Sequence, residues 1–386
     1  MEEAVIVSAL RSPMGRALKG QFIHTRIDDL GAEVIKACLS QVPQLKIEEI
    51  EDVLIGCAMP EGEQGLNVAR NISFLAGIPF SAGAVTINRF CASSLTAINM
   101  AVSAIQTGAM EVCVAGGIES MSHVTMGGFN PSLNVKLYGA GKPAAYIGMG
   151  ETAENLAKKY KISREEQDKF ALASHQKAVQ AMKEGKFKNE IVECSAVQAD
   201  GSVKKTTTDE GPREDTTLAK LGELKPAFFK EGTVTPGNSS PLTDGAAACI
   251  LMSASKAKKM GIKPLAKIKG YAVAGVDPAT MGIGPVFAVP KALKLAGMTL
   301  KDIDLIELNE AFAVQAIAVS KELNWDMAKF NVHGGAVALG HPLGCSGARI
   351  MATLLNALKI QNKTLGLETL CVGGGQGVCT IVERLV

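Results

Sequence analysis

Three short patterns recur in the same order near the two ends of the chain, and this repetition limits the fold more than any other feature. The recurring pairs are Asp52–Ile55 with Asp304–Glu307, Cys91–Ser94 with Gly344–Ala348, and Val112–Gly116 with Leu370–Gly374. Position 52 corresponds to 304, 93 to 346 and 113 to 371, so the offset stays between 252 and 258. In each half the first and third patterns read as short buried strands, and the second opens a segment of helical spacing. The sequence therefore predicts an α/β chain made of two related halves.

The stretch between the halves differs from both in texture. It is rich in glycine and proline near residues 127–143, has a charged helical pattern near 151–184, and continues in a polar run over 198–217. Long loops of this kind are more often functional than idle. We therefore predict an N-terminal half formed by residues 1–117 plus 243–265, an inserted loop domain over 118–242, and a C-terminal half over 266–386.

Charge and cysteine usage exclude several classes of protein. The chain of 386 residues carries 40 Lys and Arg against 38 Asp and Glu, a formal charge of +2, whereas nucleic-acid binders show a basic excess. No apolar run approaches the roughly 18 residues that a membrane span needs. The nine cysteines include no CxxC pair and do not cluster with histidines at metal spacing. These features predict a cytoplasmic protein without a membrane span, a metal site or a nucleic-acid partner.

Cys91 and His341 stand at local positions that favour chemistry. Cys91 lies where a strand ends and a helix begins, and backbone N–H groups with the helix dipole should lower its pKa there. The alternative for Cys91 is a small residue buried under the helix. His341 stands between Gly340 and Pro342, and the proline restricts it to an extended backbone that projects the ring from the turn.

Two further candidates follow strands in the C-terminal half. Cys371 precedes three glycines, which allow a substrate close to the backbone and free N–H groups to donate. Asn309 follows the predicted strand 305–308. It could cap a helix beginning at Glu310, or it could orient a water molecule.

Longer motifs spread over essentially the whole chain resemble the signatures of the thiolases. They are Asn88–Leu95, Thr233–Ser240, Asp244–Ala247, the NEAFA run at 309–313, Asn331–Gly335 leading into GHPLGCSGAR, and the terminal CVGGGQG. The resemblance implies the thiolase fold, in which two βαβαβ-type halves stack as five α-β-α-β-α layers with an inserted loop domain. That fold agrees with the duplication found from the residues alone. The resemblance also implies a homodimer or homotetramer.

The resemblance assigns a role to each candidate. Cys91 would be the nucleophile that becomes acylated, and His341 would take its proton. Cys371 would act as acid and base at the α-carbon of acetyl-CoA, and Asn309 would hold a water. Backbone N–H groups of Cys91 and Gly373 would form an oxyanion hole.

For coenzyme A, the resemblance implies contacts from the loop domain and its surroundings. Arg213 would meet the nucleotide, Ser240 the pantetheine, and Met149 and Phe312 the tunnel walls. The alternatives are a solvated loop charge for Arg213 and ordinary core for Met149 and Phe312. Coenzyme A and acyl-CoA would be substrates, with no permanently bound cofactor.

Departures from the biosynthetic pattern favour one branch of the family. Gly148 stands where many acetoacetyl-CoA thiolases have histidine, and Asp209–Arg213 is similar to the degradative branch. The expected activity is CoA-dependent cleavage of 3-oxoacyl-CoA to acetyl-CoA and a shortened acyl-CoA. The alternatives are an acetoacetyl-CoA-specific acetyl-CoA C-acetyltransferase and a non-catalytic acyl-CoA carrier, which should have lost Cys91, His341 or Cys371.

Overall fold

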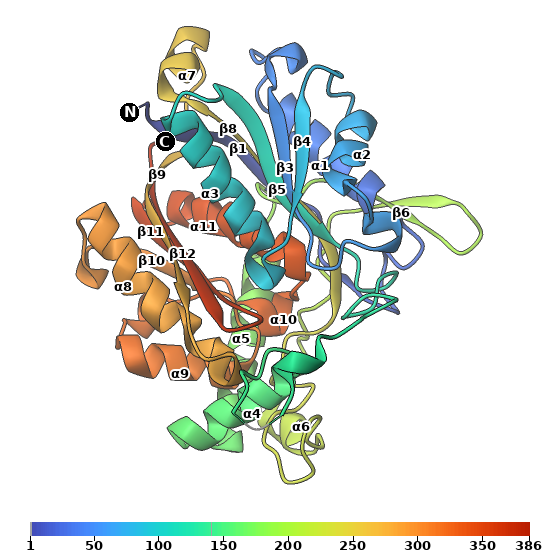
Figure 1. Cartoon of the computed structure of the whole chain (residues 1–386), viewed down its shortest axis with the longest axis vertical. Coiled ribbons are helices and arrows are strands. Elements are labelled where there is room, and N and C mark those ends of the chain that lie inside the picture. The colour runs from blue at the N-terminus through green and yellow to red at the C-terminus, as the bar shows by residue number, and fades with distance from the viewer. Residues whose placement is uncertain (1, 140) are drawn as a thin grey trace.

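A computed structural model describes residues 2–139 and 141–386, and its largest element is one mixed sheet built from both ends of the chain (Figure 1). The strands along this sheet are β10 (Leu305–Leu308), β11 (Leu365–Val372), β12 (Gln376–Arg384), β9 (Ala266–Gly275), β1 (Ala4–Arg11), β8 (Thr243–Ser253), β5 (Val112–Glu119), β3 (Asp52–Gly56) and β4 (Gly83–Ile87). The short β2 (Gly15–Arg16) pairs with β8. The two halves join between β1 and β9, where Val5 faces Lys267 and Ile6 faces Ala266.

Strand order and direction repeat on the two sides of this junction. On one side β1, β8 and β5 are antiparallel neighbours and β5 is parallel to β3. On the other side β9, β12 and β11 are antiparallel neighbours and β11 is parallel to β10. The predicted duplication of an α/β unit is therefore confirmed.

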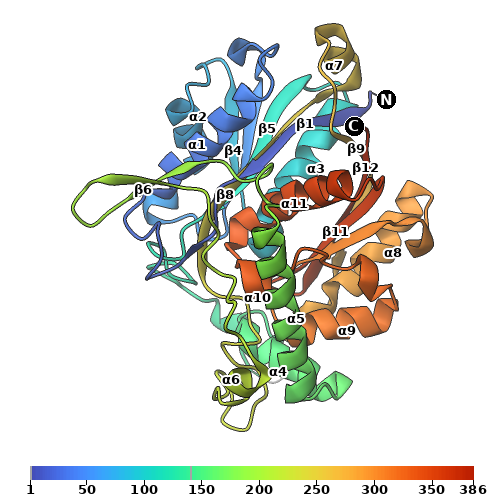
Figure 2. The same cartoon turned by 180° about the vertical axis from the view of Figure 1, so that it is seen from behind.

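Helices cover both faces of each half and create five layers. The inner helices α3 (Ser93–Gln106) and α11 (Ser346–Ile360) pack against each other between the halves. The outer helices are α1 (Ile27–Ser40) and α2 (Val68–Leu75) on the first half, and α8 (Gly284–Ala296) and α9 (Ala313–Leu323) on the second (Figure 2). Because α3 and α11 lie between the two halves of the sheet, they are buried on most sides. Each inner helix begins just after a residue expected to act in catalysis.

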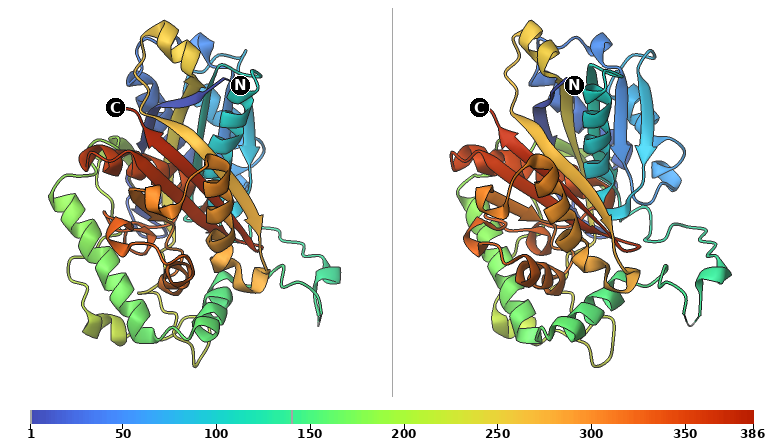
Figure 3. Two further views of the ribbon diagram at one scale, coloured as in Figure 1. Left: turned by 90° about the vertical axis from the view of Figure 1, so that its left-hand side faces the viewer. Right: turned by 60° about the vertical axis from the view of Figure 1, so that its left-hand side comes forward.

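The helices of the inserted segment lie at the far end of the second half, whereas its β-hairpin lies against α1 of the first half (Figure 2). Its helices and strands are α4 (Met149–Tyr160), α5 (Arg164–Lys183), β6 (Cys194–Val197), β7 (Val203–Thr206) and α6 (Leu218–Gly222). The charged stretch 151–184 is two helices, because Lys161 ends α4 in a left-handed conformation and Ser163 caps α5. Two short helices, α7 (Ala254–Met260) and α10 (Ala336–Leu339), lie outside it. The segment that follows β5 projects away from the sheet (Figure 3).

A buried ion-pair cluster fastens the inserted segment to β1. The Arg11 guanidinium donates from Nε to Glu190 at 2.7 Å and from Nη1 and Nη2 to the two oxygens of Asp209 at 2.7 and 2.9 Å. All three side chains are essentially inaccessible to solvent. A bidentate, desolvated pair of this kind fixes geometry strongly, since losing either partner leaves a buried charge.

Two predicted element boundaries are wrong. The strand expected to end at Gly116 and Gly117 continues to Glu119, since β5 stays paired with β8 along its whole length. The helix expected at Glu310 begins only at Ala313. Both shifts change which residues reach the site.

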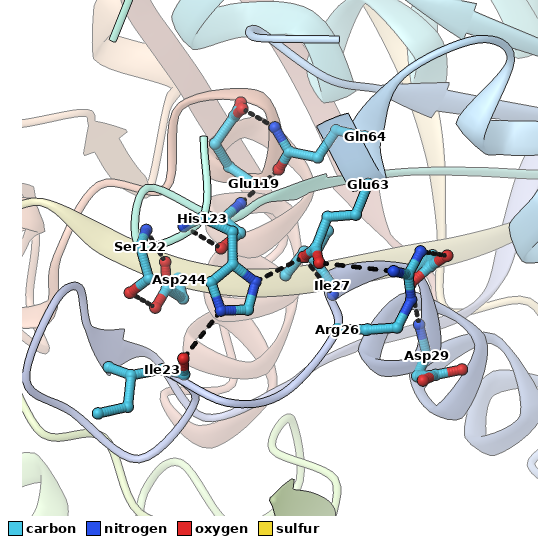
Figure 4. A network of polar contacts seen from close by, with 12 residues as sticks. Ile23, Arg26, Ile27, Asp29, Glu63, Gln64, Glu119, Ser122, His123 and Asp244 are labelled. Atoms are coloured by element: carbon cyan, nitrogen blue, oxygen red, sulfur yellow. Dashed lines mark hydrogen bonds and ion pairs between the residues drawn. The ribbon is translucent and has the colours of Figure 1, made fainter. Parts of the chain in front are cut away.

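His123 joins three loops near the N-terminal half, and this contact predicts a pH-dependent stability (Figure 4). Its Nδ1 lies 2.9 Å from Glu63 and its Nε2 lies 2.8 Å from the Ile23 carbonyl oxygen, so the protonated ring donates at both nitrogens. Burial lowers the pKa of His123, but the bonds to Glu63 and Ile23 outweigh it, and the net pKa lies above 6.5. A raised folded-state pKa adds stability that is complete below pH 6.5 and is lost as pH rises through the folded value.

We therefore expect His123→Gln to destabilise the protein by about 1 kcal/mol near pH 5.5 and by less near pH 8.5. The measurement is urea unfolding of both proteins at the two pH values. Both proteins contain the same buried neutral histidines, whose effect on stability changes with pH in the opposite direction. Subtracting the two free energies of unfolding at each pH cancels that effect. An equal loss at both pH values would contradict the protonated contact.

Candidate active site

Cys91 lies in a single 3-10 turn, Phe90–Ala92, between the end of β4 and the start of α3. The Ser93 hydroxyl closes this turn by donating to the Phe90 carbonyl oxygen at 2.7 Å and accepting from the Arg89 N–H at 2.9 Å. Phe90 has a positive φ of 41°, which is unusual for a side chain of that size. The turn holds Cys91 against the cavity while leaving it only 5% exposed.

The expectation of a lowered pKa at Cys91 is wrong for this structure. Burial raises the pKa of the thiol to about 11, although the N–H groups of Gly373 and Cys91 itself act in the opposite direction. Desolvation outweighs the helix start because the thiol is enclosed between the two halves. At neutral pH the thiol keeps its proton, so a nearby base is needed to make it nucleophilic.

His341 is suited to be that base. It lines the same cavity as Cys91 and is 4% exposed. Burial, helped by the charge of Arg349, lowers the pKa of His341 to about 3, so the imidazole is neutral at pH 7.

The hydrogen bonds of Ser346 assign the tautomer of His341. The Ser346 hydroxyl donates to the Pro342 carbonyl oxygen at 2.8 Å, so its oxygen accepts the Nδ1–H of His341 at 2.5 Å. That leaves Nε2 unprotonated and able to accept a proton.

Asn309 contacts the same imidazole. Its amide nitrogen lies 3.2 Å from Nε2 of His341, whereas its Oδ1 is buried without a hydrogen-bond partner in the described structure. The capping interpretation is wrong, since α9 begins at Ala313 with Phe312 before it. The unpaired oxygen is compatible with the other interpretation, in which Asn309 orients a water.

Cys371 and Gly373 lie at the hairpin between β11 and β12. Cys371 is fully buried near the end of β11, and burial followed by the proximity of Cys91 holds its pKa well above the ordinary value. Gly374 and Gly375 have φ of 76° and 84°, which only glycine adopts readily, and they aim the Gly373 N–H at Cys91. The structure thus brings Cys91, Cys371 and Gly373 together.

The cavity at Cys91 has a volume of about 330 Å³ and a mostly apolar wall. Met149, Ser240 and Phe312 all line it. The Ser240 hydroxyl donates to the Ala311 carbonyl oxygen at 3.0 Å, and the Phe312 ring packs on Phe228 at 6.1 Å. These positions are compatible with the predicted tunnel wall for Met149 and Phe312 and with the predicted pantetheine contact for Ser240.

Arg213 lies outside that cavity, in a neighbouring one of about 160 Å³. The two cavities share Ser239 and Pro241 in their walls, and Arg16 is a second cation beside Arg213. Neither arginine has an ion pair in the described part of the chain. An apolar cavity therefore continues into one with positive charge.

Two further residues contact the turn that carries His341. One of them is Ser346. It could have been identified from the sequence, because it corresponds to Ser93 in the duplication. The other is Glu119, a buried carboxylate for which the sequence offers no local pattern. Among residues 2–139 and 141–386, no helix could cross a membrane and no cluster of three or more His, Cys, Asp or Glu could hold a metal.

A buried cysteine, a neutral histidine and backbone N–H groups around one apolar cavity define a site for acyl transfer through a covalent thioester. Comparison with known proteins specifies the class. Residues 4–255 match the family described as "Thiolase, N-terminal domain" and residues 262–384 match "Thiolase, C-terminal domain". The chain belongs to the thiolase family and is an acyltransferase, and its predicted fold is confirmed.

Relatives match over the whole chain. A protein named 3-ketoacyl-CoA thiolase from Bacillus subtilis (strain 168) is 50% identical, with 99% of this chain and 100% of that protein covered. One of the same name from Vibrio vulnificus (strain CMCP6) is 48% identical over all of both chains. A crystal structure of the Bacillus anthracis acetyl-CoA acetyltransferase has a TM-score of 0.92 and 41% identity, covering 100% of this chain and 99% of that one.

Proposed function

We propose that the protein cleaves 3-oxoacyl-CoA with coenzyme A, releasing acetyl-CoA and a shortened acyl-CoA through an acyl-enzyme on Cys91. The observation that carries the proposal is the apolar cavity that the Cys91 thiol and the neutral His341 both line, with Cys371 buried near Cys91. Full-length relatives at about 50% identity carry the name 3-ketoacyl-CoA thiolase.

Each group then has one task in the cleavage. Nε2 of His341 takes the Cys91 proton, and the sulfur attacks the 3-oxo carbon to give a tetrahedral adduct. The N–H groups of Cys91 and Gly373 stabilise its oxyanion. The bond between carbons 2 and 3 breaks and leaves the acyl group on Cys91 and the enolate of acetyl-CoA.

A second thiol completes the chemistry. Cys371 donates its proton to carbon 2 of the enolate, while His341 and a water held by Asn309 stabilise the enolate oxygen. The Cys371 thiolate then takes the proton of the coenzyme A thiol, whose sulfur attacks the thioester on Cys91. The Cys91 sulfur leaves and takes its proton back from His341, and the shortened acyl-CoA is released. Two thiols are needed because one holds the departing acyl group while the other delivers the proton.

The cavities support a route for the substrate. In this proposal Met149, Phe312 and Ser240 face the pantetheine arm, and Arg213 faces the phosphates of the nucleotide in the adjoining cavity. Coenzyme A and acyl-CoA act as substrates, and no permanently bound cofactor is required.

Activity over 3-oxoacyl-CoA substrates from about C4 to C16 tests the chain length. We expect cleavage to continue beyond C4, since Gly148 places no side chain on the largely apolar wall near Cys91. Activity confined to C4 would instead establish the acetoacetyl-CoA-specific acetyltransferase. If acetyl-CoA forms no covalent adduct with the protein, the remaining interpretation is the non-catalytic acyl-CoA carrier.

Assembly and compartment belong to the same proposal. β4 pairs only with β3 in the described structure, and its open edge lies near exposed Phe80 and Val85. A second copy of the chain could pair with this edge and also contact the exposed Phe129 and Val135. This pairing would give the homodimer from which a homotetramer could form.

All nine cysteines are unpaired, which favours the reducing cytoplasm.

A further inference from the structure

Glu119, the last residue of β5, is a buried carboxylate on which four N–H donors and the Cys57 thiol converge. Its Oε2 accepts from the N–H of Ala58 at 2.8 Å and from that of Gly344 at 2.7 Å. Its Oε1 accepts from the N–H of Met59 at 3.2 Å and from the side-chain amide of Gln64 at 3.0 Å. Figure 4 shows Glu119 beside Gln64. Donors from both halves of the molecule therefore meet on one side chain.

The contact with Gly344 holds the turn that carries His341. Gly344 follows His341 by three residues and leads into α11. A Cβ on Gly344 would lie 2.8 Å from the Glu119 carboxylate and 2.7 Å from the Ile118 carbonyl oxygen, so the turn rests directly on the end of β5. Displacing the carboxylate would release the turn on which the imidazole depends.

The contact with Ala58 leads to the turn that carries Cys91. The Ala58 carbonyl oxygen accepts from the side-chain amide of Asn88 at 2.9 Å, and Oδ1 of Asn88 accepts from the Phe90 N–H at 2.9 Å. Phe90 has the strained positive φ and immediately precedes Cys91. One carboxylate thus connects with the backbone on both sides of the reacting centre.

We propose that Glu119 is a positioning residue that holds the Cys91 turn and the His341 turn in the mutual arrangement needed for proton transfer between them. Both carboxylate oxygens must act as acceptors, because N–H groups point at each of them and the Cys57 thiol adds a further donor at Oε1. A glutamine amide offers one oxygen and would direct its NH₂ group at backbone N–H groups. The inference rests on the proposed function, since it assumes that Cys91 and His341 act as a pair.

Glu119→Gln in the full-length protein tests the proposal. We expect kcat to fall about 100-fold with KM for acetyl-CoA nearly unchanged, because a shift of about 1 Å between reacting groups has an effect of this size. Alkylation of Cys91 by iodoacetamide should also move to lower pH, since the Glu119 charge raises the pKa of this thiol. Loss of stability alone would change neither kcat per folded molecule nor that pH profile.

Two further variants complete the design. Asn88→Ala removes, at an exposed side chain, the two hydrogen bonds that connect Ala58 with Phe90, and it should slow acetylation of Cys91 even if Glu119→Gln does not fold. Glu63→Gln is the matched control, since Glu63 accepts from the Ile27 N–H at 3.0 Å and contacts His123 but neither turn. It should keep the kcat of the unaltered enzyme.

Unaltered kcat and alkylation profile in folded Glu119→Gln, or unaltered acetylation in Asn88→Ala, would overturn the positioning role. The proposed function fails separately, if the unaltered protein forms no acetyl adduct on Cys91. The alkylation profiles of the two proteins still test Glu119 in that case.

Discussion

Cys91→Ala should form no covalent adduct with acetyl-CoA and should lose turnover by about 10⁴-fold or more, because no other group can hold the departing acyl chain. The thiol is enclosed against the cavity, and the N–H groups of Gly373 and Cys91 meet at it. Intact mass after incubation with acetyl-CoA reads the adduct directly, and a thiolysis assay reads turnover.

The duplication supplies a matched control for this variant. Cys345 ends the 3-10 turn Leu343–Cys345 before α11, as Cys91 lies in the turn before α3, and it is also buried and unpaired. Cys345→Ala removes the same atom from the corresponding turn, one position further along, and should keep the adduct. An adduct that persists in Cys91→Ala, or one that disappears in Cys345→Ala alone, would refute Cys91 as the nucleophile.

The sequence predicts the duplicated α/β fold because its buried strands and helix starts are local features that recur at nearly constant offset. It also places Cys91, His341 and Cys371 at the ends of elements, and strand ends that follow equivalent paths in two halves converge at one edge. The prediction of a helix that begins at Glu310, directly after Asn309, is wrong for a different reason. Residues 309–312 stay extended because Ser240 donates to Ala311 and Ala313 donates to Asn238, and both partners come from the inserted segment.

Burial explains the other differences between sequence and structure. The position of Cys91 at the start of a helix suggests a lowered pKa. Desolvation has the larger effect on this pKa, and it depends on how the second half packs against Cys91. The role of Glu119 could not be predicted either. Its contact with Gly344 joins residues 225 positions apart and corresponds to no periodic pattern in the sequence. Ser346 could be found from the sequence, since it matches Ser93 in the duplication, although it accepts from a histidine ring whereas Ser93 accepts from a backbone N–H.

Cys371→Ala should separate the two halves of the reaction. Acetylation of Cys91 requires no proton at the α-carbon, so the adduct should still form with acetyl-CoA. Cleavage of 3-oxoacyl-CoA should fall about 10³-fold, since the enolate loses its proton donor. Because burial and the proximity of Cys91 hold the pKa of Cys371 well above the ordinary value, this thiol carries its proton at neutral pH and can donate it.

Exchange of the α-protons of acetyl-CoA in D₂O distinguishes this role from a general defect. We expect the exchange to be lost in Cys371→Ala and kept in Cys379→Ala, which alters a buried, unpaired cysteine on the adjacent strand β12. Exchange that survives in Cys371→Ala would assign the α-proton to another base, for which His341 is the nearest candidate on the cavity wall. Loss of the Cys91 adduct in the same variant would instead make Cys371 part of the acylation step, because its thiol would then be needed before any carbon–carbon bond is broken.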